Sequence, residues 1–503
     1  MSVQLISVDA MARLEPETLV EALSGEAGVI LLRSGLFDSR QARYSLVTAR
    51  PFLAVRSFST RCELRWEQEN RVVFGNPWQV LENLMSRYEL LDEVDYPFPL
   101  GGCFGYWGYD LKNFVEPRLP RNAINDLELP DCSLGFYDSL VVFDHQLDKV
   151  WIVATGLEPD GSRSRGAAAR QVEFWQGRLA VAGNQNESAS GEYRPERELA
   201  IVRSNFTRDD YLQIVVQAKE YIRRGDIYQV NLAQRLMVDT ALSGWDLFRR
   251  LYDVSPAPFS AYFAGEELDV VSSSPELFLC LSGQQVRTRP IKGTRPRSLD
   301  PVRDAQLSYE LQTSPKEMAE LVMITDLLRN DLGRICEYGS VQVPELIRLE
   351  RYPQVQHLVS TVEGRLRNDM THAGALARCF PGGSITGAPK IRAIEIIDEL
   401  EPVTRGAYTG CHGYLGFNRE SQLSISIRTA VVAPAVTTFH AGAGIVADSD
   451  PEMEYDETLA KARGFLDAVG LVGKQNITSA AESSFGGRVR VPGNGKVKRR
   501  SSV

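Results

Sequence analysis

The sequence predicts a mixed α+β protein. Segments with strand-like composition occur in several groups along the chain, and segments with helical periodicity lie between these groups. The two kinds of segment do not alternate one by one, so the pattern lacks the regular βαβ order of parallel-sheet proteins. No internal repeat of fixed period is present. The chain has 503 residues, of which 43% are hydrophobic and 24% are charged, a composition typical of a globular protein with a large core.

The first part of the chain is predicted to consist mainly of strands. Strand character appears at 29–32, 44–47 and 52–55, and again at 140–143 and 150–153, which a polar turn joins. After residue 155 the composition changes to Gly, Ser and charged residues, and 167–182 has helical character. We therefore predict an N-terminal domain over residues 1–160 and a linker with a short helix over residues 161–196.

Residues 197–472 are predicted to form a second, larger domain. A helix begins after Thr207, a candidate N-cap, and covers 208–223 before Gly225. The remaining predicted strands are 228–237, 261–263, 269–272, 277–281, 422–431 and 437–446, and the remaining helices are 316–336, 388–399 and 452–468. Residues 473–503, with Lys496, Lys498, Arg499 and Arg500 among Gly, Ser and Val, are predicted to be a disordered basic tail.

Charge and cysteine usage exclude several classes of function. The net charge is -9 and no broad basic face is apparent, so nucleic acid is not an expected partner. The seven cysteines show no paired metal-binding spacing, which indicates free thiols in a reducing compartment. No signal-peptide core appears in the first thirty residues, and no apolar run approaches the ~20 residues that span a bilayer. We expect a cytoplasmic protein without a membrane partner.

Two predicted helices carry closely spaced carboxylates. Glu317 and Glu320 are three residues apart, as are Glu454 and Glu457, and Lys461 follows Glu457 by four residues. Residues at these spacings are neighbours on one helix face. Carboxylates with few His or Cys nearby suit Mg²⁺, which prefers oxygen ligands. The alternative for either pair alone is ordinary ion pairing on a helix surface.

Two glycine-containing segments, one lysine and one histidine are further candidates. The loop 380–390, which includes Ser384, leads into a helix and offers amides and hydroxyls to an anion, and the loop 441–448 offers bare amides after a strand. Lys292 lies between Pro290 and Gly293 in a cation-rich segment that predicts a strand end running into a tight turn. A neutral lysine amine is a nucleophile or a base, whereas the alternative is a solvated surface lysine. His357 stands beside apolar residues, where a core histidine is the alternative reading.

The order of these motifs resembles that of the chorismate-utilising enzymes. The motifs are Pro-Ile-Lys-Gly-Thr at 290–294, Ala-Glu at 319–320 leading to Asp-Leu-Leu-Arg-Asn-Asp-Leu at 326–332, Gln-His-Leu-Val-Ser at 356–360, Gly-Ala-Pro-Lys at 387–390 and Gly-Ala-Gly-Ile-Val at 442–446. The resemblance covers about residues 27–470. Several motifs in this order are far more specific than any one of them.

The resemblance implies a fold and a site. The fold would be of the anthranilate synthase type, with two large antiparallel sheets forming a β-sandwich core and helices packed outside. Glu320 and Glu457 would bind Mg²⁺ with the ring carboxylate of chorismate, and Glu317 and Glu454 would act through water. His357 would lie beside the metal and the departing C4 hydroxyl. Other matching positions would hold the enolpyruvyl carboxylate (Tyr408, Arg428, Gly442, Ala443 and Gly444), face the substrate (Lys461) or close over the ring (Ser384).

Within the resemblance, three residues indicate the reaction. The water-adding branches use a lysine base at the position of Gln229, and an amide cannot be that base. Aminodeoxychorismate synthases have the lysine that matches Lys292, which attacks C2 before ammonia adds at C4, and a catalytic glutamate that matches Glu276. The resemblance therefore implies the large component of such a synthase, a transaminase-class enzyme that makes 4-amino-4-deoxychorismate for p-aminobenzoate and folate. The alternatives are anthranilate synthase component I, with Lys292 a bystander, and an inactive regulatory partner.

The resemblance also implies partners. The sequence shows no Gly-x-Cys-x-Gly glutaminase signature and leaves no room for a lyase domain after residue 470, so a separate glutamine amidotransferase subunit would supply ammonia. A family tryptophan pocket maps to Ser34, Gln41, Ala42, Arg43, Tyr44, Pro258, Phe259 and Ser260. Feedback-inhibited relatives have Leu-Leu-Glu-Ser where this chain has Leu-Leu-Arg-Ser at 31–34, which places inhibition in doubt but leaves a bound tryptophan possible.

Overall fold

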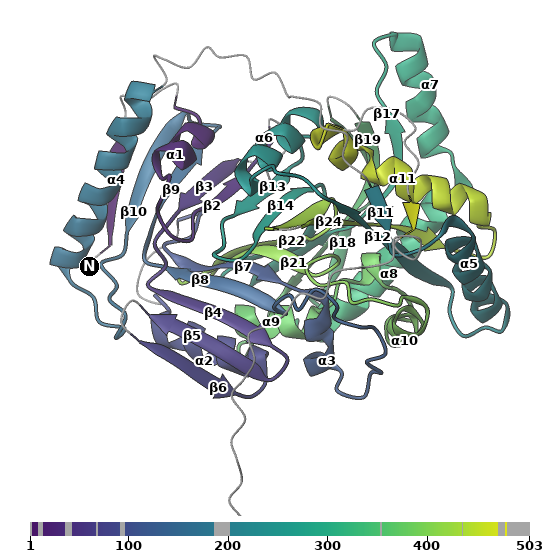
Figure 1. Cartoon of the computed structure of the whole chain (residues 1–503), viewed down its shortest axis with the longest axis horizontal. Coiled ribbons are helices and arrows are strands. Elements are labelled where there is room, and N and C mark those ends of the chain that lie inside the picture. Colours follow the sequence, from purple (N-terminus) through teal and green to yellow (C-terminus); the bar gives the residue numbers. More distant parts are fainter. Residues whose placement is uncertain are drawn as a thin grey trace, which may run out of the picture.

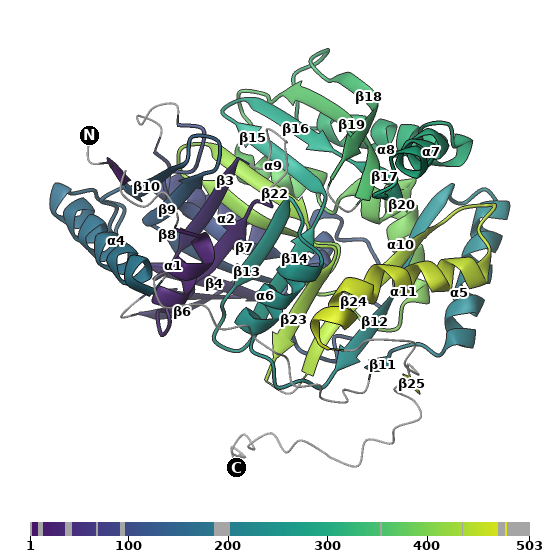
Figure 2. The ribbon, with the colours of Figure 1, turned by 90° about the horizontal axis from the view of Figure 1, so that it is seen from above.

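The computed structural model describes residues 3–8, 14–35, 43–66, 69–90, 96–185, 202–352, 355–434, 436–470 and 478–479. Over these residues the chain forms two large sheets and eleven α-helices, so the α+β prediction is confirmed. Paired strands run antiparallel, except for β11 beside β25. Figure 1 shows the sheets in the centre, with α4 at one end of the molecule and α5, α10 and α11 at the other. The view from above in Figure 2 has the same arrangement.

The first sheet has thirteen strands. In spatial order they are β1 (Gln4–Val8), β10 (Lys149–Ala154), β9 (Ser139–Asp144), β3 (Tyr44–Thr48), β2 (Ile30–Arg33), β13 (Phe259–Phe263), β14 (Asp269–Ser274), β23 (Thr429–Ala433), β24 (Val436–Ile445), β12 (Gln229–Val238), β11 (Val202–Ser204) and β25 (Thr478–Ser479), with β20 (Gly387–Ala388) beside β12.

The second sheet has twelve strands. Their order is β17 (Ile291–Pro296), β19 (Val355–Arg365), β16 (Gln285–Arg289), β15 (Leu277–Ser282), β22 (Glu420–Ile425), β21 (Cys411–Gly416), β7 (Gly102–Trp107), β8 (Cys132–Tyr137), β4 (Leu53–Phe58), β5 (Arg61–Trp66) and β6 (Asn70–Phe74), with β18 (Gln342–Arg351) beside β19.

Both sheets contain strands from each of the two predicted domains. In the first sheet β2 pairs with β13, and in the second β7 pairs with β21. The predicted domain boundaries therefore do not separate the sheets, and they stay a prediction. The predicted linker contains α4 (Arg165–Gln185), a helix of 21 residues rather than a short one. Its buried side chains pack in the same cluster as those of α1 (Pro16–Ala22).

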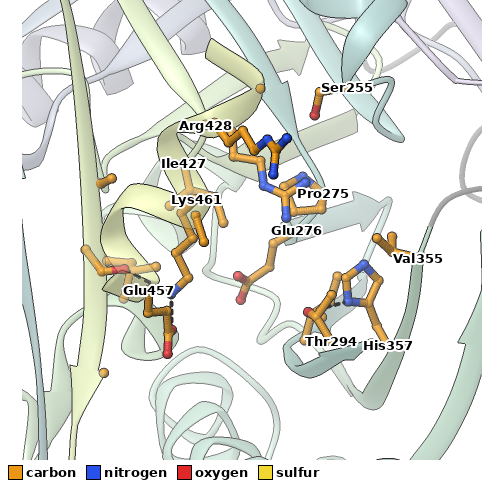
Figure 3. Close-up of a pocket in the computed structure, with 18 of the residues that line it drawn as sticks. Ser255, Pro275, Glu276, Thr294, Val355, His357, Ile427, Arg428, Glu457 and Lys461 are labelled. Atoms are coloured by element: carbon orange, nitrogen blue, oxygen red, sulfur yellow. Dashed lines mark hydrogen bonds and ion pairs between the residues drawn. The ribbon is translucent and has the colours of Figure 1, made fainter. Parts of the chain in front are cut away.

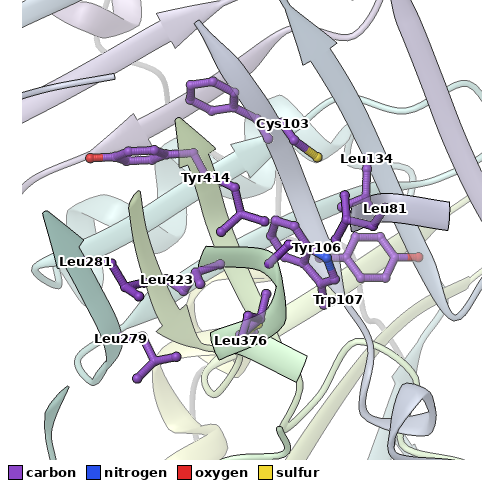
Figure 4. Close-up of a cluster of buried hydrophobic side chains, with 14 of the residues drawn as sticks. Leu81, Cys103, Tyr106, Trp107, Leu134, Leu279, Leu281, Leu376, Tyr414 and Leu423 are labelled. Carbon is purple, nitrogen blue, oxygen red and sulfur yellow. The ribbon is translucent and has the colours of Figure 1, made fainter. Parts of the chain in front are cut away.

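Alternate residues of the first sheet face two different cores. Leu140 and Val142 of β9 belong to a cluster shared with the second sheet, whereas Val141 and Phe143 belong to a cluster covered by helices. Side chains in a strand alternate between the faces of the sheet, so a continuous apolar run such as this predicts a strand buried on both sides. Figure 4 shows part of the shared cluster, where Tyr414 of β21 lies near Cys103 of β7.

The helices cover the outer faces. α1, α4, α6 (Gly244–Val254) and α11 (Pro451–Ala468) contribute to the cluster over the first sheet, and α5 (Arg208–Arg223) and α10 (Lys390–Leu400) pack on β12 and β24. The remaining helices are α2 (Pro77–Tyr88), α3 (Lys112–Val115), α7 (Pro301–Gln312), α8 (Pro315–Gly333) and α9 (His372–Cys379). As predicted, Thr207 caps α5, because its hydroxyl accepts the Asp210 N–H at 3.0 Å. None of the helices in the described residues is long and apolar enough to cross a membrane.

A buried arginine fixes the segment that carries Tyr408. Arg405 is 2% exposed and forms an ion pair with Glu401 at 2.6 Å. Its guanidinium also donates to the backbone carbonyl of Asn231 at 2.8 Å, and it lies over the Tyr408 ring. The pair thus ties the end of α10 to β12 and to the turn that precedes β21.

We expect Arg405→Leu to lower the free energy of unfolding by about 3–5 kcal/mol, because Glu401 would be left buried without its partner. Urea unfolding of the variant and the native protein measures the difference. The control is Arg365→Leu, whose ion pair with Glu337 is exposed and is expected to contribute less than about 1 kcal/mol. Equal losses in the two variants would contradict the assignment of Arg405 as a structural anchor.

Candidate active site

A cavity of about 790 Å³ lies among α8, α11, β17, β19 and β24. Almost all the predicted catalytic, substrate and metal residues line it. They are Glu276, Lys292, Glu317, Glu320, His357, Ser384, Tyr408, Arg428, Gly442, Gly444, Glu454, Glu457 and Lys461. Figure 3 shows Glu276 projecting between Glu457 and Lys461 on one side and Thr294 and His357 on the other. Residues separated by as many as 185 positions in the sequence thus share one site.

Two capped helices bring the glutamates to this cavity. α8 begins at Pro315 after Ser314, whose hydroxyl accepts the Glu317 N–H, and α11 begins at Pro451 after Asp450, whose carboxylate accepts the Met453 N–H. An oxygen-bearing N-cap followed by proline is a favoured helix start. The starts fix the helical phase, so that Glu317 and Glu320 of α8 and Glu454 and Glu457 of α11 all reach the cavity.

Lysines are interspersed among these carboxylates. Lys292 and Lys316 lie 3.9 Å and 4.0 Å from the two carboxylate oxygens of Glu320, and Lys461 lies 2.7 Å from Glu457. Burial raises the pKa of Glu320 above its usual range, although both neighbouring lysines oppose the shift. Burial acts in the same direction on Glu457, but the charge and hydrogen bond of Lys461, together with the charges of Lys292 and Lys316, outweigh it and lower the pKa.

The carboxylates fit a divalent cation. Glu454 is buried, and its Oε2 atom has no hydrogen-bond partner among the described residues. No three Asp, Glu, His or Cys side chains of the described chain are grouped closely enough to hold a metal by themselves. Mg²⁺ usually takes one or two protein carboxylates and completes its shell with water and substrate oxygens. The donor set suits that mode, and Mg²⁺ binding by Glu320 and Glu457 stays a prediction.

Lys292 lies at a bulge, not at the tight turn predicted for this segment. β16 continues through Pro290 into β17, and both strands pair with β19. The pairing register shifts between Lys292 and Thr294, and Gly293 between them has a φ of 65°, which glycine adopts readily. A bulge redirects side chains at a strand edge. Here it accompanies a Lys292 side chain that is only 16% exposed and lines the cavity.

Glu276 is a buried carboxylic acid whose pKa is raised. Burial raises its pKa to about 7, although a hydrogen bond from Ser384 and the charges of Lys292 and Lys461 oppose the shift. A carboxyl group with this pKa exchanges a proton readily near neutral pH. Glu276 can therefore deliver a proton inside the cavity.

His357 is a neutral imidazole in this environment. It is 2% exposed, and burial together with nearby Arg428 lowers its pKa to about 4. Its Nδ1 atom lies 2.9 Å from the Thr294 hydroxyl, which orients the ring. A neutral imidazole can donate or accept one hydrogen bond without bringing a charge to the site.

Arg428 has the properties of an anion-binding group. The predicted strand 422–431 is in fact two strands, β22 and β23, and Arg428 lies in the interruption with a φ of 48°. Burial lowers its pKa, and no ion pair to it is recorded among the described residues. A partly buried guanidinium without a carboxylate partner is costly, and an acidic ligand would relieve that cost.

Tyr408 stands beside the backbone of β24. Its ring stacks on His440 with centroids 5.1 Å apart and planes at 9°. Residues 441–445 fall both in the predicted strand 437–446 and in the predicted loop 441–448, and they belong to β24 and pair with β12. Gly442 and Gly444 line the cavity, but the side chain of Ala443 points into the core with α5 and α10. Only the backbone of Ala443 is therefore available to a ligand.

The loop 380–390 is held by internal contacts. Lys390 lies 2.7 Å and 2.6 Å from the carboxylate oxygens of Asp331 and donates to the carbonyls of Cys379 and Pro381. These contacts fix the loop against α8, and Ser384 then reaches Glu276. Sequence reasoning missed further residues that line the cavity, among them Asn231, Lys316 and His440. Side chains of a strand alternate between its two faces, so Asn231 lies on the same face of β12 as Gln229, two residues earlier. This spacing could have revealed Asn231 from the sequence.

The predicted tryptophan pocket is a small cavity of about 40 Å³ between the sheets. Ser34, Tyr44, Pro258, Phe259 and Ser260 line it, whereas Gln41 and Ala42 lie outside the described residues. Arg43 does not line it and instead pairs with Asp144 at 2.6 Å. The volume has room for a few water molecules.

Arg33, the residue that departs from the feedback-inhibited pattern, also lines this small cavity. It is paired with Glu15 at 2.9 Å and with Glu17 at 2.8 Å. The cavity would have to widen to accept an indole ring, and tryptophan binding stays a prediction.

Comparison with known proteins identifies the family of the chain. The family described as chorismate binding enzyme matches residues 35–467. The chain is 36% identical to anthranilate synthase component 1 of Acetivibrio thermocellus, over 93% of this chain and 96% of that protein. It is 38% identical to aminodeoxychorismate synthase component 1 of Escherichia coli strain K12, over 87% and 92%.

A solved structure supports the fold. The crystal structure of anthranilate synthase component I from Streptococcus pneumoniae TIGR4 superposes with a TM-score of 0.72 at 29% identity, over 86% of this chain and 93% of that chain. The predicted anthranilate-synthase-type fold is thereby confirmed. The family match, the relatives and the cavity agree, and the chain belongs to the chorismate binding enzymes.

Proposed function

We propose that this enzyme is the large component of an aminodeoxychorismate synthase, which converts chorismate and ammonia to 4-amino-4-deoxychorismate. The observation that carries the proposal is the position of Lys292. Its amine lies inside the cavity, 3.9 Å from Glu320, where a bound substrate ring would be within reach. Relatives with this activity and anthranilate synthases have similar identity to the chain, so the proposal rests on the site chemistry.

The proposed reaction replaces a hydroxyl group by an amino group. The Lys292 amine attacks C2 of the ring, both ring double bonds shift by one position, and the C4–O bond breaks. Glu276, whose pKa is about 7, gives its proton to the departing oxygen, which leaves as water. Ammonia then attacks C4, both double bonds shift back, and the bond from C2 to Lys292 breaks. The added nitrogen loses one proton, which restores the proton of Glu276.

The other residues bind and orient the substrate. Arg428, Tyr408 and the backbone of 442–444 hold the enolpyruvyl carboxylate, and His357 donates a hydrogen bond to the C4 oxygen. Mg²⁺ bound by Glu320 and Glu457 would neutralise the ring carboxylate. Gln229 cannot take a proton from water, which disfavours water as the nucleophile. We further propose a cytoplasmic enzyme that receives ammonia from a separate glutaminase and feeds p-aminobenzoate and folate synthesis.

Product analysis tests the proposal. The protein is incubated with chorismate, Mg²⁺ and ammonium chloride, with and without aminodeoxychorismate lyase. p-Aminobenzoate that appears only with the lyase is the expected result. Fluorescent anthranilate formed without the lyase would instead identify an anthranilate synthase, and no turnover would identify an inactive partner.

A further inference from the structure

Two neighbouring amides beside Lys292 are buried without hydrogen-bond partners. Gln229 is 0% exposed, and both its Oε1 and Nε2 atoms are unpaired among the described residues. Asn231 is 9% exposed, lines the catalytic cavity, and has an unpaired Oδ1 atom. Buried polar groups are nearly always hydrogen-bonded, because an unpaired one loses its hydration without compensation. The unpaired Asn231 Oδ1 atom at the cavity wall therefore indicates a polar ligand, whereas Gln229 does not itself line the cavity.

The two amides lie on the same face of β12, because residues two apart in a strand point the same way. They lie over two glycines of the neighbouring strand β24. A Cβ atom on Gly442 would be 2.7 Å from Asn231 Oδ1, and one on Gly444 would be 2.9 Å from Gln229 Nε2. The same Gly444 position is 3.7 Å from Lys292 Nζ. The two amides thus pack closely over the glycines, where a side chain at either glycine position would clash with them.

The backbone around these amides is fixed. The Asn231 N–H donates to the Thr386 carbonyl at 2.8 Å, and the Asn231 carbonyl accepts from Arg405 at 2.8 Å. Gln229 and Val230 pair with β20. Backbone groups are therefore satisfied at Asn231 while the side-chain amide is not. The amides are held in place without using their own hydrogen-bonding capacity, an arrangement suited to a ligand site.

We propose that Asn231 holds the ammonia molecule that attacks the ring. This inference rests on the proposed use of ammonia. Ammonia donates an N–H bond to Asn231 Oδ1, and its lone pair is left to form the new C–N bond. Neither amide can accept a proton, so water in the same place stays a weak nucleophile, whereas ammonia needs no base. Asn231 is thus a residue that selects the nucleophile.

Steady-state kinetics with ammonium chloride as the nitrogen source tests this role. Chorismate consumption is followed for Asn231→Leu and for the milder Asn231→Ser. We expect the KM for ammonia to rise tenfold or more in Asn231→Leu and by less in Asn231→Ser, while the KM for chorismate changes less than twofold. A raised KM for chorismate with an unchanged KM for ammonia would overturn the proposal, since Asn231 would then hold the substrate. Unchanged KM values for both ammonia and chorismate would overturn the proposal as well.

Gln234→Leu is the matched control. Gln234 is a buried amide of the same strand, but its atoms are already paired with Ser204 and Thr458. This variant is expected to lose stability without a change in either KM, which separates a folding defect from a lost ammonia site.

The readout is chorismate consumption, so a native enzyme that makes anthranilate would refute the proposed product alone. An unchanged ammonia KM in the Asn231 variants would refute the ammonia site alone. A native enzyme that does not consume chorismate with ammonium would refute both.

Discussion

Lys292→Ala is expected to reduce formation of aminodeoxychorismate from chorismate and ammonia on the order of a thousandfold, because the variant lacks the amine that attacks C2. The other two cavity lysines are poor substitutes. Lys461 is engaged with Glu457 and donates to the Gly442 carbonyl at 2.9 Å, and Lys316 is 57% exposed. The lyase-coupled assay measures the rate, and a normal rate in the variant would refute the nucleophile assignment.

Lys292→Arg separates attack from positioning. A guanidinium keeps the positive charge near Glu320 but is not a nucleophile at neutral pH. We expect it to be as inactive as the alanine variant, whereas a purely electrostatic role would preserve much of the rate. Incubating the native enzyme with chorismate and Mg²⁺ without ammonia should also give a protein mass increase equal to chorismate less one water. Lys149→Ala, a change at an exposed lysine of β10, is the control for nonspecific effects.

Glu276→Gln is expected to lower kcat roughly 10²- to 10⁴-fold, the usual contribution of a general acid. In the native enzyme, kcat/KM for chorismate should fall as the pH rises above about 7, because the carboxyl group then loses the proton it must deliver. The profile is measured at a constant concentration of neutral ammonia. A profile that stays flat through pH 8 would contradict the assignment.

The same substitution should stabilise the fold at high pH. The pKa of Glu276 is about 7 in the folded protein and near 4.5 when unfolded, so the folded state binds more protons between these values. Stability conferred by this group therefore falls as the pH rises from about 4.5 to 7 and stays low above it. The Glu276→Gln variant does not lose this stability as the pH rises. Its free energy of unfolding, measured in urea, should therefore exceed that of the native protein by up to about 3 kcal/mol at pH 8 and by close to zero at pH 4. Equal gains in the free energy of unfolding at pH 8 and pH 4 would contradict the raised pKa of Glu276.

The helices of the site could be predicted because their signals are local. Capping residues and prolines mark the starts of α8 and α11, and three-residue spacing places the glutamates on one face of each helix. The strands with continuous apolar runs, such as β9, were predictable for the same reason.

Errors occurred where pairing with a distant strand determines the backbone. Pro290 and Gly293 favour a turn, yet β19 pairs with both flanking strands and makes the segment a bulge. Gly442 and Gly444 lie where the predicted strand 437–446 and the predicted loop 441–448 overlap, and the structure has the strand because β12 pairs with β24 as far as Ile445. Glycine permits both conformations, so the partner strand decides between them.

By itself, the sequence determined the family motifs, their order, and the kinds of chemical group available to the site. Only the tertiary structure decided which of these groups lack partners. Among the described residues, it left Arg428 without a carboxylate and the Gln229 amide and Asn231 Oδ1 without hydrogen-bond partners, while it used Lys390 and Arg405 to hold the backbone. The reason is physical: whether a polar group is satisfied depends on neighbours that are far apart in the chain, and burial sets the free-energy cost when none is present.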